Sequence, residues 1–454
     1  MDGPYEPTWE SLAGHEVPDW FHDAKLGIFI HWGPYAVPAY ADPDGDHAYA
    51  EWYPYYMYQD GSDTQVYHEE TYGSDVEYVD FVDDWHAEQW DPDAWASFFA
   101  DDVGAKYVVL TAEHHDGFPL WPTHYTKYNA GEMGPERDLV GDLADAVRAE
   151  GLRFAGSYHA NLNYYQPGFD GPFGHPDYYV GPDGFRDEES LPGDEYVDFL
   201  NAKHRELIRR YEPDALWFDV PIADADQYRA REVIADFYNR AATEWDKEVV
   251  VNDRSATDAR DQDLWDFRTP EYDAYDEITP FKWEACRGIG RSFGYNAEET
   301  AEDHLRAEEL VHTFVDMVSK NGNLLINVGP RADGTIPDLQ REPLAGLGSW
   351  LSDHGDAIYA TRPWVVAEDD AAEVAVRYTH KDDTLYAILL DRPADRLTLT
   401  GDGHLDASEV ADVRVLADNE SLSFEASDDL VVNAGDLPAD HHAYALALEG
   451  VSPA

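Results

Sequence analysis

Residues 107–116, YVVLTAEHHD, begin as a run of apolar side chains and end abruptly in ionisable ones. A near-continuous apolar run of this length suits a strand that is buried on both faces, as in a parallel sheet. Similar runs recur as far as residue 330, and most of them also end in polar groups. These further runs are LGIFIHW (26–32), FAGSYH (154–159), ALWFD (215–219), EVVVNDR (248–254), LWDFRTPE (264–271), KWEACR (282–287) and NLLINVGP (323–330).

Helical patterns lie between several of these runs. Asp91, followed by a proline, can cap the start of one helix, and a second helix can begin at Asp138 and end at Gly151. Apolar stripes at helical spacing also occupy 197–211 and 311–318, where Gly322 can end the second stripe.

Strands that alternate with helices in this way predict an α/β fold, a TIM-like (β/α)8 barrel. Two connections, those that join the runs at 248–254, 264–271 and 282–287, are too short for full helices, so we expect an irregular barrel. In such a barrel the carboxyl ends of the strands form the active site, which makes the polar ends of the runs the place to search.

From Trp364 onward the pattern changes, and apolar residues alternate with polar ones at a period of two. EVAVRYTH (373–380) and TLYAILL (384–390) show this alternation, and shorter runs follow between Asp, Gly and Asn turns. This pattern predicts an antiparallel β-sandwich. We therefore expect two domains: a catalytic barrel in residues 1–355 and a C-terminal β-sandwich in 356–454 with a structural or accessory role.

The composition excludes several classes of function. With 94 acidic and 31 basic side chains, the chain has a net charge of −63, so we expect neither nucleic acid nor an anionic membrane as a partner. Cys286 is the single cysteine, which excludes an internal disulfide and a thiolate metal site. No segment reads as a signal peptide or a membrane span, so we expect a soluble, cytoplasmic protein. The sequence does not decide whether the protein forms a homo-oligomer.

The charge also indicates the solvent to which the chain is adapted. Mutual repulsion of so many carboxylates loosens a fold in dilute buffer, whereas at molar salt the Debye length falls to about 3 Å and the repulsion is screened. The excess of acid therefore predicts a halophilic, salt-adapted protein.

Adjacent histidines, His114 and His115, follow one of the predicted strands. A metal site needs further ligands, which His31 and His159 can supply from the ends of two other strands, so a metal-dependent hydrolase is one alternative. Adjacent histidines differ, however, from the spaced pairs that commonly chelate metals. We therefore favour hydrogen bonding to a ligand and expect no metal and no cofactor.

Aromatic and acidic residues gather at the same predicted barrel mouth, as a sugar-binding site requires. Asp219 ends a buried strand and suits a nucleophile, and Glu271 ends another and suits a proton donor for glycoside cleavage. A noncatalytic sugar-binding protein is a second alternative. The aromatic and acidic residues are Trp32, Trp217, Trp283, Phe293, Glu51, Asp219, Glu271 and Glu284.

The ordered motifs resemble the retaining α-L-fucosidases of glycoside hydrolase family 29. The resemblance spans residues 9–363, and the predicted sandwich also resembles that family's C-terminal domain. The motifs that carry it are IHWG (30–33), EWYP (51–54), HHDGF (114–118), LWFD (216–219), NDR (252–254), WDFRTPEY (265–272), KWEACRGIGRSFGYN (282–296) and GNLLINVGPRADGTIP (322–337).

The resemblance implies hydrolysis of fucosylated oligosaccharides or glycosides without a metal. Asp219 then resembles the nucleophile and Glu271 the acid/base, with Glu284 as the second candidate for the acid/base. The acidic, tyrosine-rich stretch at 42–84 is expected to lie over the barrel mouth and to shape the site beyond fucose. The resemblance implies that fucose is held by His31, Glu51, His114, His115, Tyr158, Trp217, Arg254 and Phe293.

Overall fold

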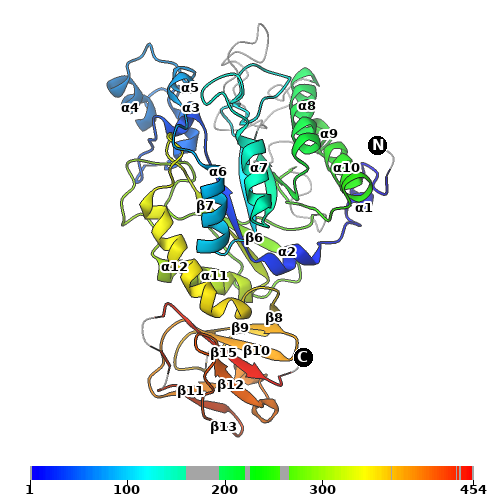
Figure 1. The fold of residues 1–454 in the computed structure, drawn as a ribbon, viewed down its shortest axis with the longest axis vertical. Helices are drawn as coiled ribbons and strands as arrows, with labels where there is room; N and C mark the ends of the chain where they lie inside the picture. The colour runs from blue at the N-terminus through cyan, green and yellow to red at the C-terminus, as the bar shows by residue number, and fades with distance from the viewer. Residues whose placement is uncertain are drawn as a thin grey trace.

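A computed structural model describes residues 3–45, 47–159, 194–219, 225–255, 265–369, 371–435, 437–438 and 441–451. Helices surround a parallel sheet in the N-terminal part of the chain, and a smaller all-β part packs at one end of it (Figure 1). Within the described residues, no helix is long and apolar enough to cross a membrane.

The parallel sheet has seven strands in the order β5-β4-β3-β2-β1-β7-β6. Each neighbouring pair is parallel, as the near-continuous apolar runs predicted. The strands are β1 (Leu26–Ile30), β2 (Tyr107–Glu113), β3 (Arg153–Tyr158), β4 (Ala215–Phe218), β5 (Val250–Val251), β6 (Trp283–Gly288) and β7 (Gly322–Val328).

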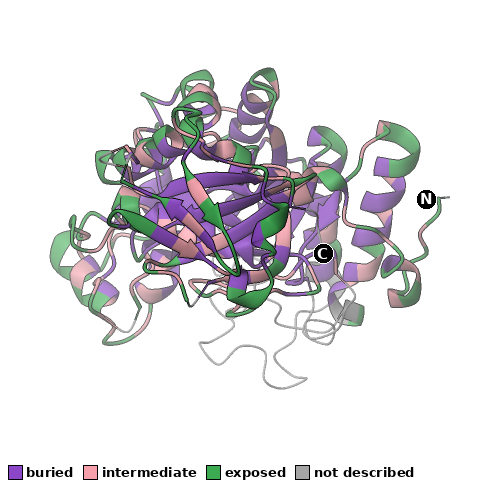
Figure 2. Ribbon diagram, turned by 90° about the horizontal axis from the view of Figure 1, so that it is seen from below, coloured by how far each residue is buried: buried purple, intermediate pink, exposed green. Residues whose placement is uncertain are grey.

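Both faces of this sheet are buried, and alternate side chains of each strand enter different apolar clusters. On β1, Phe29 lies in the inner cluster, whereas Ile28 and Ile30 face the outer layer. Trp217 of β4 and Phe267 also belong to the inner cluster. Figure 2 views the molecule from the end that carries the C-terminal strands, and it shows buried strands at the centre and exposed residues on the surrounding helices. Burial on both sides explains why the strands read as unbroken apolar runs rather than as alternating ones.

The two edge strands, β5 and β6, are linked through residues 267–271. Isolated parallel bridges join Asn252 to Phe267, Arg268 to Trp283, and Glu271 to Cys286. The sheet is therefore curled, with this segment between its edges.

The strands predicted at 248–254 and 264–271 are much shorter in the structure, where β5 has two residues and 265–271 forms bridges only. Two residues explain why the segment 265–271 does not form a continuous strand. Thr269 donates its N–H to the Asp253 side chain at 3.1 Å instead of to a neighbouring strand, and Pro270 has no N–H to donate.

The helices begin and end largely where the sequence predicted. Asp91 and Asp138 accept from the N–H groups of Ala94 and Gly141 and so cap their helices, and Gly151, with φ +77°, follows the second helix. Gly322, expected to end a helix, instead begins β7. The main helices are α2 (Asp19–Ala24), α6 (Pro92–Ser97), α7 (Leu139–Ala149), α8 (Asp194–Tyr211), α10 (Ala230–Arg240), α11 (Ala307–Ser319) and α12 (Asp338–His354), with shorter ones at α1 (Trp9–Leu12), α3 (Tyr53–Tyr56), α4 (Asp63–Thr71), α5 (Asp80–Asp84) and α9 (Ala225–Tyr228).

The C-terminal part consists of two antiparallel sheets, in the orders β12-β15-β10-β9-β8 and β11-β14-β13, around their own apolar core. Arg377 of β9 donates to Asp316 of α11 at 2.6 Å, and Trp350 of α12 donates to the Ala443 carbonyl at 3.0 Å, so these helices anchor this part. The strands are β8 (Arg362–Glu368), β9 (Val376–Lys381), β10 (Thr384–Leu389), β11 (Arg396–Leu399), β12 (Asp412–Val415), β13 (Phe424–Ala426), β14 (Leu430–Asn433) and β15 (Tyr444–Glu449).

Candidate active site

A cavity of about 140 Å³ lies at the carboxyl ends of the parallel strands. His31, His114, His159 and Asp219 reach it directly after β1, β2, β3 and β4. The polar ends of the apolar runs therefore converge, as a parallel barrel requires. The cavity is lined by Phe29, His31, Tyr49, Glu51, Trp52, His114, His159, Trp217, Asp219, Arg254, Glu271, Cys286 and Phe293.

Asp219 is a buried carboxylate, with 8% of its surface exposed. Its Oδ1 accepts a hydrogen bond from Arg254 Nη1 at 2.8 Å, and its Oδ2 lies 3.2 Å from His159 Nδ1. Nε2 of His115 lies 3.5 Å from the same Oδ2. Burial alone would raise the pKa of this carboxyl, but His159, His115 and Arg254 together hold the pKa well below its usual range. The group is therefore ionised and held in one orientation, as a nucleophile requires.

Arg254 joins the two candidate catalytic carboxylates. Its Nη1 donates to Asp219 and also to Glu271 Oε2 at 2.9 Å. Its Nε and Nη2 are held by the hydroxyl and carbonyl of Thr269, and the guanidinium lies over Trp217 at 4.8 Å from the ring centre. Because one nitrogen binds both carboxylates, the two bonded oxygens lie less than about 6 Å apart. This upper limit accommodates the separation of about 5 to 5.5 Å between the carboxyl groups of retaining glycosidases.

Glu271 is the more accessible of the two carboxylates. Its side chain is 33% exposed, against 12% for Asp219. The Tyr49 hydroxyl donates to its Oε1 at 3.1 Å. Glu271 therefore faces the open side of the cavity, where a proton donor to a leaving group has to lie.

His159 has a polar neighbour at each ring nitrogen. Nδ1 faces Asp219, and Nε2 contacts the Ser157 hydroxyl. A proton on Nδ1 points toward Asp219, and the Ser157 hydroxyl borders Nε2. His159 therefore helps to orient the Asp219 carboxylate.

His31 is held in one tautomer, with its proton on Nδ1. The Asn327 amide donates to the Phe293 carbonyl at 2.6 Å, which leaves the Asn327 Oδ1, 2.7 Å from His31 Nδ1, as the acceptor. Burial lowers the pKa of His31 and of His114 well below the usual value, so both rings are neutral. His31 then presents the lone pair of Nε2, which can accept from a ligand hydroxyl.

Three of these histidines also form the set that could hold a metal ion. His31, His114 and His159 each offer a nitrogen within 4.8 Å of the others. His31 keeps Nε2 free, and His159 Nδ1 lies 3.2 Å from Asp219 Oδ2. Neutral imidazole nitrogens can accept from hydroxyl groups as well as ligate a cation, so the geometry of the set fits both chemistries.

Glu51 is buried at the cavity wall and held by the loop after β6. Its Oε2 accepts from the Gly294 N–H at 2.7 Å and lies 3.1 Å from the Ser292 hydroxyl. Burial raises the pKa of Glu51 to about 7.

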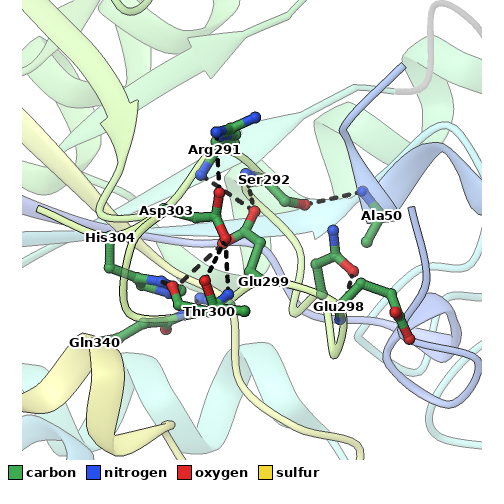
Figure 3. Close-up of polar contacts among 12 residues, drawn as sticks. Ala50, Arg291, Ser292, Glu298, Glu299, Thr300, Asp303, His304 and Gln340 are labelled. Atoms are coloured by element: carbon green, nitrogen blue, oxygen red, sulfur yellow. Dashed lines mark hydrogen bonds and ion pairs between the residues drawn. The ribbon is translucent and has the colours of Figure 1, made fainter. Parts of the chain in front are cut away.

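A second buried carboxylate supports that loop from behind. Glu299 Oε1 accepts from the N–H groups of Arg291 and Ser292 at 3.1 and 2.7 Å, and its Oε2 lies 3.5 Å from His304 Nε2 (Figure 3). The Ser292 hydroxyl accepts in turn from the Ala50 N–H at 2.9 Å. Glu299 thus fixes the backbone on which Phe293 and the Glu51 contacts depend.

All of the residues predicted for catalysis and fucose binding except His115 and Tyr158 line the cavity. Trp32 and Trp283, which were also expected at the barrel mouth, do not line it and pack instead in the outer apolar cluster. His115 does not line the cavity, but its Nε2 lies 3.5 Å from Asp219 Oδ2. The prediction for Tyr158 does not fit the structure, because strand parity directs Ser157 and His159 inward and Tyr158 outward into the helix-facing layer. There its hydroxyl donates to the Leu200 carbonyl at 3.1 Å.

Glu284, the second candidate for the acid/base, does not line the cavity. Its Oε1 accepts from Trp217 Nε1 at 2.9 Å, and its Oε2 accepts from the Tyr107 hydroxyl. Both oxygens are thus committed, and Glu284 holds the indole that supports Arg254.

Sequence reasoning missed four residues of the cavity: Phe29, Tyr49, Trp52 and Cys286. Trp52 lies inside the EWYP motif, and that motif could have indicated Trp52 as a site residue. Phe29 and Cys286 read only as parts of apolar runs, and Tyr49 is one of many tyrosines in its stretch. His159 was considered only as a metal ligand.

Comparisons with known proteins point to one family. Residues 1–356 match the family described as Alpha-L-fucosidase. The chain is 33% identical over 407 residues to the alpha-L-fucosidase of Dictyostelium discoideum, covering 88% of this chain and 83% of that protein. It is 35% identical over 404 residues to the tissue alpha-L-fucosidase of Bos taurus, covering 86% and 78%. It superposes on the Thermotoga maritima alpha-fucosidase solved in complex with fucose with a TM-score of 0.81 and 40% identity, over 98% of this chain and 99% of that one.

Proposed function

This chain belongs to the alpha-L-fucosidase family and is an alpha-L-fucosidase, a glycoside hydrolase, and we propose that it cleaves terminal α-L-fucosides with retention of configuration. The observation that carries this proposal is the single Arg254 nitrogen that binds both Asp219 and Glu271. It supports the proposal because it holds one oxygen of each carboxylate close to the other, and a double displacement needs closely spaced carboxylates.

In the first step the ionised Asp219 attacks the anomeric carbon of fucose, and Glu271 gives its proton to the departing glycosidic oxygen. A covalent fucosyl ester of Asp219 forms. In the second step Glu271 takes a proton from water, the water oxygen attacks the same carbon, and Asp219 leaves as a carboxylate. Two inversions give net retention.

The remaining cavity residues bind the sugar. His31, His114 and Glu51 offer hydrogen bonds to the fucose hydroxyls, while Trp217 and Phe293 offer apolar walls to the ring and the C6 methyl group. The His114 Nδ1 supports this assignment, since it is buried and has no hydrogen-bond partner among the described residues.

Two finer features of the enzyme belong to the same proposal. We infer that residues 267–271 act as the eighth strand of an irregular (β/α)8 barrel, supported by their bridges to both edge strands. We also infer adaptation to high salt, supported by the net charge of −63.

The stereochemistry of the first product tests the mechanism. Hydrolysis of an aryl α-L-fucoside, followed by NMR, should release α-L-fucose before mutarotation, whereas β-L-fucose as the first product would rule out the double displacement. Asp219→Gly should lower kcat by several orders of magnitude, and azide should restore turnover and give the β-L-fucosyl azide. Asp219→Asn is the matched control, because its side chain still fills the space that azide needs.

A further inference from the structure

Three histidines of the cavity lie close enough together to bind one metal ion. His31, His114 and His159 come directly after β1, β2 and β3, and each offers one nitrogen within 4.8 Å of the other two. All three side chains are buried, yet all three line the cavity. Imidazole nitrogens are ligands that borderline cations such as Zn²⁺ and Cu²⁺ prefer, and three histidines supply the protein ligands of some zinc sites.

The spacing of the three nitrogens needs only small side-chain movements to suit such an ion. Zn²⁺–N bonds are about 2.0 to 2.1 Å long, so two nitrogens on a tetrahedral ion lie about 3.3 Å apart. Because the three nitrogens already lie within 4.8 Å of one another, ring rotations of about 1 Å at each nitrogen can close the difference. The cavity of about 140 Å³ leaves room for the ion and for a water ligand.

Two of the rings are already arranged as metal ligands usually are. Nδ1 of His31 lies 2.7 Å from the Asn327 Oδ1, and this contact fixes the ring with its Nε2 free. Metal-ligating histidines almost always donate their other N–H to such an outer acceptor. Nδ1 of His114 is buried and has no hydrogen-bond partner among the described residues, so this ring too has a nitrogen to offer.

The charges around the cavity also favour a cation. The Oδ2 of Asp219 lies 3.2 Å from His159 Nδ1, so a carboxylate oxygen is available as a fourth ligand. Arg254 binds the other oxygen, Oδ1, and leaves Oδ2 to the histidines. Glu51 and Glu271 also line the cavity, so among its described lining residues the carboxylates outnumber the single guanidinium.

We propose that His31, His114 and His159 form a site for a borderline divalent cation such as Zn²⁺, with Asp219 as the fourth ligand, and that the bound ion inhibits the enzyme by excluding fucose. The ion takes the histidine nitrogens that are assigned to fucose hydroxyls, and it takes the carboxylate that attacks the anomeric carbon. Binding of the ion does not depend on the proposed function, whereas its competition with fucose rests on it. Mg²⁺ and Ca²⁺, which prefer oxygen ligands, should not bind here.

Calorimetric titration with ZnCl₂ tests the site without any turnover. A large excess of MgCl₂ occupies the surface carboxylates but not a nitrogen site. We expect one tightly bound Zn²⁺ per chain. His31→Ala and His114→Ala should each raise its Kd about 100-fold or more, because loss of an outer-shell partner alone costs about 10- to 100-fold. His86→Ala is the control, since His86 is exposed and does not line the cavity. Equal Kd values in the wild type and the two cavity variants would overturn the proposal.

Co²⁺ gives a reading that needs no variant. In the wild-type enzyme it should show the intense visible absorption of a four- or five-coordinate site, and added L-fucose should abolish that absorption. A spectrum of the hydrated ion alone would overturn the proposal, as would a site spectrum that saturating fucose leaves unchanged.

The kinetics of inhibition test the competition. Zn²⁺ should raise KM for an aryl α-L-fucoside while kcat stays unchanged, and EDTA should reverse the effect. Inhibition that lowers kcat alone would place the ion outside the fucose cavity and contradict the proposal. A wild-type enzyme that binds Zn²⁺ through His31 and His114 but has no affinity for fucose would confirm the cation site and contradict the proposed function instead.

Discussion

Replacing Arg254 by Gln tests the bond on which the proposed mechanism depends. The guanidinium donates to Asp219 at 2.8 Å and to Glu271 at 2.9 Å, and both bonds are charge-assisted. The shorter, neutral amide can replace neither. Asp219 keeps His115 and His159, so the carboxylate loses only part of its support.

The expected loss follows from these contacts. A hydrogen bond to a charged group contributes about 1.5 to 3 kcal/mol, and breaking one partner out of a buried pair costs about 3 to 5 kcal/mol. We therefore expect kcat/KM to fall between about 10²- and 10⁴-fold. The pKa of Asp219 is lowered in the folded enzyme in part by Arg254, so its removal raises that pKa. Since the nucleophile has to be ionised, the acid limb of the kcat/KM profile should move to higher pH.

The assay is the pH dependence of kcat/KM for an aryl α-L-fucoside, measured for wild type, Arg254→Gln and a control. Arg287→Gln is the control, because Arg287 lies on β6 but donates to the Gly288 carbonyl and does not line the cavity. A fall in rate with an unmoved acid limb would refute the reasoning, since Arg254 would then not stabilise the ionised Asp219.

Three further predictions concern the proton donor, the loop behind the site and the solvent. Glu271→Ala should lower the fucosylation rate strongly for poor leaving groups and little for good ones, whereas Glu284→Gln should lower both alike; equal losses in Glu271→Ala would favour Glu284 as the acid. Glu299→Ala leaves two backbone N–H groups without their acceptor and should raise KM and lower the melting temperature, while Glu299→Gln retains an acceptor oxygen and should restore KM; a KM unaffected by Ala would mean that the loop needs no such support. The melting temperature should rise steeply between about 0.1 and 1 M KCl, as the Debye length falls from about 10 to 3 Å, and an unchanged melting temperature would remove the case for salt adaptation.

The fold was largely predictable because its signals are local. A strand buried on both faces, such as β1 or β7, has to be apolar along its whole length, and a helix N-terminus needs an acceptor such as Asp91. The segment 265–271 was not predictable in the same way. Its residues read as a strand, but Thr269 bonds to the Asp253 side chain, a preference that only the packed structure reveals.

The same distinction between local and tertiary signals applies to the candidate site. The sequence by itself determined which residues end the strands, and in a parallel barrel those ends converge whatever the details, so Asp219, His31 and His114 could be placed at one mouth. Only the tertiary structure decided between Tyr158 and His159, because adjacent residues of a strand point to opposite faces and a shift of one position exchanges them. It alone placed one nitrogen of Arg254 between Asp219, which follows β4, and Glu271, which lies in the bridged segment 267–271. Contacts between residues so far apart depend on how the strands pack together, and no local pattern of residues encodes that.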